Sequence, residues 1–117
     1  MKRVLIVDDA AFMRLALRTM LEPNGFEVVG EAENGEVAIT MYNQLKPDIV
    51  TMDITMPDMD GVEALKAIRA IDSSAKVVII SALGQQSRVK EAVILGAAGF
   101  IVKPCKEETV LEVLNKI

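Results

Sequence analysis

The sequence contains no histidine, no tryptophan and a single cysteine, and only 3% of its residues are aromatic. The absence of histidine excludes a Ser-His-Asp triad, a Cys-His pair, a histidine metal ligand and an imidazole base. Because Cys105 is the only cysteine, an internal disulfide and a cysteine-based zinc cluster are excluded as well. Any chemistry must therefore rest on carboxylates, hydroxyls, lysines and hard cations.

Long hydrophobic runs and an excess of positive charge are also missing. No apolar stretch reaches the length of a membrane span, and Met1-Lys2-Arg3 leads into a strand pattern rather than a signal peptide. The formal net charge of −4 gives no support to nucleic-acid binding. The length of 117 residues suits one domain with an aliphatic core. We therefore expect a single cytoplasmic domain over residues 1–117 that binds neither membranes nor nucleic acid.

Strand and helix patterns alternate along the chain with short connections. Apolar runs predict strands at 3–7, 26–32, 49–52, 76–80 and 100–102. A helical pattern follows each strand, and the apolar face of the first helix is predicted to consist of Phe12, Leu15, Ala16, Thr19 and Met20. Because crossovers between parallel strands are right-handed, this (βα)5 pattern predicts an α/β fold in which helices cover both faces of a parallel sheet.

Four of the predicted strands end in polar residues that suit one chemical site. Asp8 and Asp9 follow the first strand, Asp53 the third, Ser81 the fourth and Lys103 the fifth. The carboxyl ends of parallel strands share one edge of the sheet, where ligands bind in such folds. Alone, Asp9 has an ordinary explanation as a helix cap and Asp53 as a turn former. Their combination at a single edge indicates a functional site.

The chemistry of these residues favours phosphoryl transfer with a hard cation. Carboxylates gathered at one edge repel each other, and an all-oxygen site with few protein ligands suits Mg²⁺. A carboxylate beside Mg²⁺ can attack phosphorus and form an acyl phosphate. Lys103 would place a positive charge on one phosphoryl oxygen and Ser81 a hydroxyl on another. Such a reaction needs no general base, so the absence of histidine is compatible with it.

The motifs at the strand ends resemble those of response-regulator receiver domains. The resemblance rests on Val7-Asp8-Asp9, the segment 52–57 with Asp60-Gly61, Ser81-Ala82 and Lys103-Pro104, in the family's order and over the whole chain. Within the family it is strongest to the single-domain regulators of chemotaxis. It implies a flavodoxin-like (CheY-like) fold, a doubly wound five-stranded parallel sheet with strand order 2-1-3-4-5.

The resemblance also implies a role for each site residue. Asp53 would accept a phosphoryl group from a phosphohistidine on a CheA-like histidine kinase. Asp9, Asp53 and the backbone carbonyl of Thr55 would bind Mg²⁺, and Asp8 would hold a water molecule bound to the ion. Lys103 would contact the phosphoryl group, and its peptide bond to the following proline would be cis. The protein would catalyse its own phosphorylation and dephosphorylation without being an enzyme for another substrate.

A switch and a set of partners follow from the same resemblance. Ser81 would move towards the phosphoryl group on activation, and Phe100 stands where chemotaxis regulators commonly have a tyrosine that acts as a switch. Phosphorylation would alter the surface formed by the fourth helix, the fifth strand and the fifth helix. The output partner would be the flagellar switch protein or another protein target, with a dedicated phosphatase as a further partner. The protein itself would be a monomer.

Two alternative functions remain open on the sequence alone. A phosphorelay receiver, or a receiver that is a fragment of a longer regulator, would carry the same motifs. An aspartate-nucleophile phosphohydrolase of the haloacid-dehalogenase type also uses Asp, Mg²⁺, Ser or Thr, and Lys. That class expects a second acid two residues after the nucleophile, where this sequence has Thr55, and a cap insertion that is not present.

Overall fold

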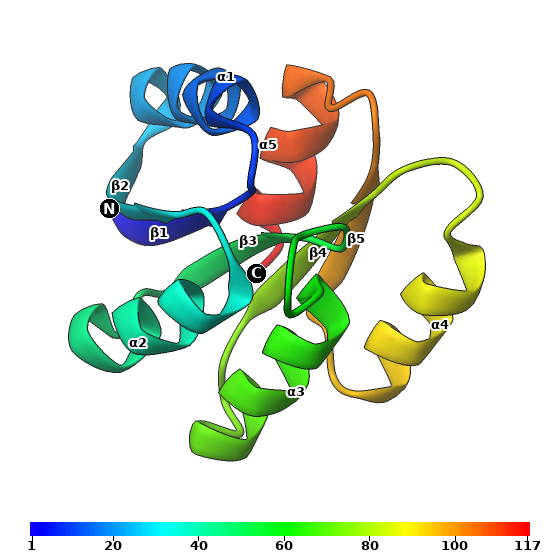
Figure 1. The fold of residues 1–117 in the computed structure, drawn as a ribbon. Coiled ribbons are helices and arrows are strands. Elements are labelled where there is room, and N and C mark those ends of the chain that lie inside the picture. Colours follow the sequence, from blue (N-terminus) through cyan, green and yellow to red (C-terminus); the bar gives the residue numbers. More distant parts are fainter.

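The protein folds around a five-stranded parallel sheet, seen here in a computed structural model that describes residues 1–117 (Figure 1). The strands are β1 Lys2–Val7, β2 Phe26–Ala32, β3 Ile49–Asp53, β4 Val77–Ser81 and β5 Gly99–Val102. Their order in the sheet is β2-β1-β3-β4-β5, and every neighbouring pair is parallel. The predicted fold class and strand order are thereby confirmed, and the predicted strand bounds differ from the observed ones by at most one residue at an end.

Five helices cover the two faces of the sheet. They are α1 Ala11–Leu21, α2 Gly35–Leu45, α3 Gly61–Ile71, α4 Gln86–Ile94 and α5 Glu107–Asn115, with a 3₁₀ turn, η1 Glu22–Asn24, directly after α1. Helices α1 and α5 lie on one face, and α2, α3 and α4 lie on the other (Figure 1). None of these helices combines the length and the apolar composition needed to cross a membrane.

The strands in the middle of the sheet are buried on both sides and divide the core into two parts. In β1, Leu5 belongs to the part of the core that includes residues of α2, α3 and α4, whereas Ile6 belongs to the part that includes residues of α1 and α5. Successive side chains of a strand point to opposite faces, so each central strand contributes to both parts of the core. This arrangement explains why the central strands appear in the sequence as continuous aliphatic runs rather than as alternating patterns.

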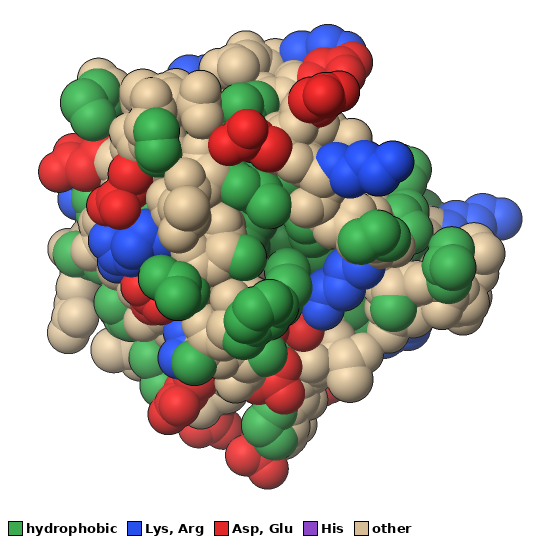
Figure 2. Space-filling view, turned by 90° about the horizontal axis from the view of Figure 1, so that it is seen from above, with side chains coloured by type: hydrophobic (Ala, Val, Ile, Leu, Met, Phe, Trp, Pro, Cys, Tyr) green, Lys and Arg blue, Asp and Glu red, His purple; other side chains and the backbone are tan.

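The first helix packs through a face that overlaps the predicted one only in part: of the predicted residues, Met20 is partly buried against the core. Leu17 and Leu21 are fully buried against the sheet and α5, whereas Phe12 and Leu15 are 78% and 62% exposed. Apolar residues stand on both sides of this helix, so periodicity alone did not identify the buried side. Figure 2, which views the molecule from the side of α1 and α5, shows hydrophobic side chains at the surface between charged ones.

Candidate functional site

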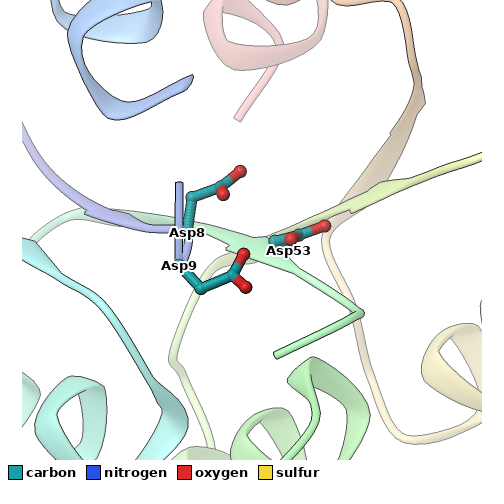
Figure 3. A group of neighbouring side chains, drawn as sticks. All are labelled: Asp8, Asp9 and Asp53. Carbon is teal, nitrogen blue, oxygen red and sulfur yellow. The ribbon is translucent and has the colours of Figure 1, made fainter. Parts of the chain in front are cut away.

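Three acidic side chains meet at the carboxyl edge of the sheet. Asp8 and Asp9 follow β1, and Asp53 is the last residue of the adjacent strand β3. One carboxylate oxygen from each residue lies within 4.8 Å of the other two. Figure 3 shows the three side chains grouped where these strands end. The structure therefore brings together the three aspartates that the sequence placed at one edge.

Two of the three aspartates are buried, and burial changes their ionisation. Asp8 is 1% exposed and Asp53 is 3% exposed, whereas Asp9 faces solvent. Burial raises the pKa of Asp8, against the effect of the Ala10 N–H, which donates to its Oδ1 at 2.9 Å. Burial also raises the pKa of Asp53, and the nearby charge of Asp8 raises it further. Asp9 does not cap a helix, because the cap position of α1 is Ala10.

Lys103 supplies the positive charge of the site. Its Nζ lies 3.2 Å from Oδ1 of Asp53 and 3.9 Å from Oδ2 of Asp8. Burial alone would lower the pKa of Lys103, but attraction to Asp53 and Asp8 outweighs burial and the pKa is raised. The backbone N–H of Lys103 donates to the Ser81 carbonyl at 2.7 Å, and the peptide bond to Pro104 is cis, as the resemblance implied. An ammonium group is therefore held against both buried carboxylates at neutral pH.

One oxygen of the acidic cluster has no hydrogen-bond partner. Oδ2 of Asp8 is buried and accepts no hydrogen bond. A buried carboxylate oxygen that accepts no hydrogen bond is unfavourable, and a cation closer to it than the Lys103 ammonium, which is 3.9 Å away, would remove much of that penalty. Mg²⁺ takes oxygen ligands and keeps several waters, so a cluster of three carboxylates with the Asp9 side open to solvent suits it. The donor set therefore fits a magnesium ion.

The two predicted switch residues lie on neighbouring strands and differ in exposure. Ser81 ends β4 and is buried, whereas the Phe100 side chain on β5 is 48% exposed. A pocket opens between them, and its lining includes both residues together with Leu83 and Val89. The Phe100 ring therefore lies outward, beside a space that leads to Ser81.

Gln85 belongs to the site although no sequence pattern pointed to it. Its side-chain amide donates to Oγ1 of Thr55 at 2.7 Å, and its side-chain oxygen accepts from the Ala82 N–H at 2.7 Å. Thr55 lies in the loop after Asp53, and Ala82 directly follows Ser81. One side chain therefore joins the two loops next to the aspartates. Gln85 and Thr55 are 30 positions apart in the chain, so only the tertiary structure identifies this contact.

Asp60 and Gly61 hold the end of β3 in place. The Asp60 side chain accepts from the Glu63 N–H at 2.9 Å and Glu63 bonds back to the Asp60 N–H, a capping box that begins α3. The Asp-x-x-Glu spacing is a sequence signal for this cap. At Gly61, a Cβ atom would lie 2.1 Å from the Asp53 carbonyl oxygen. The backbone that carries Asp53 can therefore come this close to α3 only because residue 61 has no side chain.

Comparison with known proteins identifies the family. Residues 4–115 match the model of the response regulator receiver domain. The chain belongs to the response regulator receiver family. The receiver is 57% identical over 116 residues to the chemotaxis protein CheY of Thermotoga maritima, a match that covers 99% of this chain and 97% of that protein. It is also 57% identical over 114 residues to CheY of Bacillus subtilis, covering 97% and 95% of the two chains.

A solved structure gives the same result for the fold of the receiver. A chain in the crystal structure of the CheX–CheY–BeF₃–Mg²⁺ complex from Borrelia burgdorferi matches with a TM-score of 0.94 and 42% sequence identity. The match covers 98% of the receiver and 87% of that chain. The receiver is thus a module of a two-component regulatory system, and the family match favours this function over the phosphohydrolase alternative.

Proposed function

We propose that residues 1–117 form one receiver domain that is activated by phosphorylation of Asp53 and acts in chemotaxis. The observation that carries the proposal is the position of the Asp53 carboxylate, which is buried, 3.2 Å from the Lys103 ammonium and grouped with Asp8 and Asp9. The high identity to two CheY proteins over nearly their full length supports the choice of pathway.

In the proposed reaction, a carboxylate oxygen of Asp53 attacks the phosphorus of a phosphohistidine on a CheA-like histidine kinase. The new O–P bond forms as the N–P bond breaks, and the bonding electrons stay on the imidazole nitrogen, which then takes up a proton. Lys103 stabilises negative charge on one phosphoryl oxygen, and the Ser81 hydroxyl donates to another. Hydrolysis of the acyl phosphate by water returns Asp53 to its free carboxylate.

The same proposal assigns a magnesium ion to the acidic cluster. Asp9, Asp53 and the backbone carbonyl of Thr55 would hold the ion, and Asp8 would hold a water molecule bound to it. When bound, Mg²⁺ supplies positive charge that offsets the carboxylates and the incoming phosphoryl group. Two observations support this assignment: Oδ2 of Asp8 is buried and accepts no hydrogen bond, and the B. burgdorferi complex contains Mg²⁺.

The output of the proposed switch is a change of surface on α4, β5 and α5. Ser81 moves towards the phosphorylated Asp53 and makes room for the outward ring of Phe100 to turn into the pocket beside it. The changed surface then binds the flagellar switch protein. The CheX–CheY complex of B. burgdorferi supports a second protein partner, such as a dedicated phosphatase. The receiver acts in this scheme as a monomer.

A mass measurement on Asp53→Asn tests the proposal. The wild-type protein is incubated with Mg²⁺ and acetyl phosphate, and its intact mass is recorded at neutral pH. We expect one added phosphoryl group per chain, absent after chelation with EDTA and absent in Asp53→Asn. Asp58→Asn is the matched control, since Asp58 is exposed, has a φ of 67° that asparagine tolerates, and lies in the same loop.

Two outcomes would contradict the proposal. Modification that persists in Asp53→Asn would place the phosphoryl group on another residue. Steady release of phosphate without any gain in mass would favour rapid turnover of the phosphohydrolase kind over a switch.

A further inference from the structure

Helix α4 is fixed to the body of the receiver by few apolar contacts. Ala92 is its only buried residue, and Val93 and Ile94 are exposed large apolar side chains near its end. A helix that buries so little apolar surface depends strongly on polar contacts for its position. The polar contacts at the start of α4 therefore add to the packing of Ala92 and Val89 in fixing where this helix lies.

Gln85 makes the first of these contacts. Its backbone carbonyl accepts from the N–H groups of Arg88 and Val89, each at 3.0 Å, and so forms the first turn of α4. Its side chain bonds to Thr55 and Ala82, each at 2.7 Å. One residue thus connects the helix with the loop after Asp53 and with the loop after Ser81.

Arg88 makes a second connection between α4 and the loop after Asp53. Its guanidinium group forms an ion pair with Asp60, the residue that caps α3, and a second ion pair with Glu91 on α4 itself. Thr55 stands near the beginning of the β3–α3 loop and Asp60 at its end. The loop that leads away from Asp53 is therefore bonded at both ends to the first turn of α4.

We propose that Gln85 is a positioning residue that couples Asp53 to α4 through Thr55 and Ala82. The inference rests on the proposed function, in which a phosphoryl group on Asp53 rearranges both loops. The two side-chain bonds of Gln85 are short, so a displacement of Thr55 or Ala82 must either carry the backbone of Gln85 and α4 with it or break a bond. Coupling of this kind passes through groups in direct contact.

Amide chemical shifts in ¹⁵N-labelled protein test this coupling. Mg²⁺ with beryllofluoride serves as the probe, because BeF₃⁻ mimics a phosphoryl group on a carboxylate. In the wild type we expect shift changes both around Asp53 and along residues 86–94. In Gln85→Met, which keeps the chain length but removes both polar atoms, changes around Asp53 remain, whereas those along α4 fall to about half or less. Gln44→Met, at an exposed position of α2, is the matched control and should behave as the wild type.

A second variant separates coupling from a merely structural effect. Thr55→Val removes the hydroxyl that accepts from Gln85 but retains the backbone carbonyl and the shape of the side chain. We expect Thr55→Val to reduce the shift changes along α4 as Gln85→Met does. In the double variant Gln85→Met/Thr55→Val, the reduction should be smaller than the sum of the two single reductions, because both substitutions remove the same hydrogen bond.

The possible failures are distinguishable. Full α4 shift changes in Gln85→Met, or losses that add in the double variant, would overturn the role of Gln85 while leaving the proposed function standing. Absence of shift changes around Asp53 in the wild type would overturn the proposed function and the coupling with it.

Discussion

At the scale of single residues, the site is a set of like charges held together against their repulsion. Asp8 and Asp53 are buried, their pKa values are raised, and Lys103 is the cation placed between them. An aliphatic core would be more favourable at this position than two carboxylates. Residues that break the ordinary rules of burial in this way are a mark of function rather than of folding.

Gly61→Ala should disturb this site without touching a carboxylate. The added Cβ would meet the Asp53 carbonyl oxygen at 2.1 Å, so the end of β3 or the start of α3 must move. We expect a loss of about 1 to 3 kcal/mol in the free energy of unfolding, typical of overpacking. We also expect slower phosphoryl uptake from acetyl phosphate, followed by intact mass against time.

Gly99→Ala gives the comparison for this prediction. There the added Cβ would meet only Cγ1 of Val113, at 3.2 Å, and a side chain can yield more easily than backbone. A similar loss of stability in both variants, with unchanged phosphoryl uptake in Gly61→Ala, would contradict a specific role for Gly61.

At the scale of elements, burial decides what a helix contributes to stability. Helix α1 carries apolar residues on two sides, but only the side with Leu17 and Leu21 packs against the sheet and α5. The Phe12 and Leu15 side chains remain exposed, and Phe12 lines a second pocket together with Lys103 and Pro104. The apolar residues of one helix therefore fall into a packed set and an exposed set.

Leu17→Ala and Phe12→Ala should separate these two sets. Leu17→Ala leaves a cavity in the core, and we expect it to lower the free energy of unfolding by about 2 to 5 kcal/mol. Phe12→Ala removes an exposed ring, and the change should stay within about 0.5 kcal/mol. Urea denaturation of both variants measures the difference, and equal losses would contradict the packing of α1 described above.

At the scale of the whole molecule, a polar contact ties neighbouring helices of one face together. The Tyr42 hydroxyl, on α2, donates to Oδ2 of Asp72, directly after α3, at 2.8 Å. Hydrogen bonds from Ser74 and then from Tyr42 lower the pKa of Asp72 to about 2. Burial, followed by the bond to Asp72, raises the pKa of Tyr42 to about 12. The Tyr42–Asp72 pair therefore makes the free energy of unfolding depend on pH in both the acidic and the alkaline range.

Tyr42→Phe should reduce stability at neutral pH, and the difference from the wild type should depend on pH. A lowered carboxyl pKa stabilises the folded state above the unfolded value of 3.8, and this contribution is lost as pH falls through about 2. A raised phenol pKa stabilises below the ordinary value of 10.0, and this contribution is lost as pH rises through about 12. The two proteins should therefore converge towards both extremes in urea denaturation at a series of pH values.

Ser74→Ala is the matched control for the pH dependence. It removes another hydrogen bond to Asp72, so the free energy of unfolding should change less with pH in the acidic range than it does in the wild type. It leaves Tyr42 bonded, and the alkaline part should stay as in the wild type. A Tyr42→Phe effect of constant size at every pH would show that lost packing, and not the hydrogen bond, carries it.

The sequence by itself determined the alternation of strands and helices and the polar residues at the strand ends. Hydrophobic periodicity is a local property, so the runs that form β1 to β5 are visible without any knowledge of their neighbours. Parallel strands share one edge, and the meeting of Asp8, Asp9 and Asp53 followed from that rule. The strand order came from the resemblance to a family and not from the pattern.

Only the tertiary structure decided the packing and the contacts between loops. The buried side of α1 depends on which helix and strand face it, and no pattern within α1 contains that information. The contact of Gln85 with Thr55 joins residues that are 30 positions apart, and the approach of Gly61 to the Asp53 carbonyl depends on how α3 meets β3. Such features are set by distances in space between segments that the sequence separates, because side chains far apart in the chain meet only once the sheet and its helices have formed.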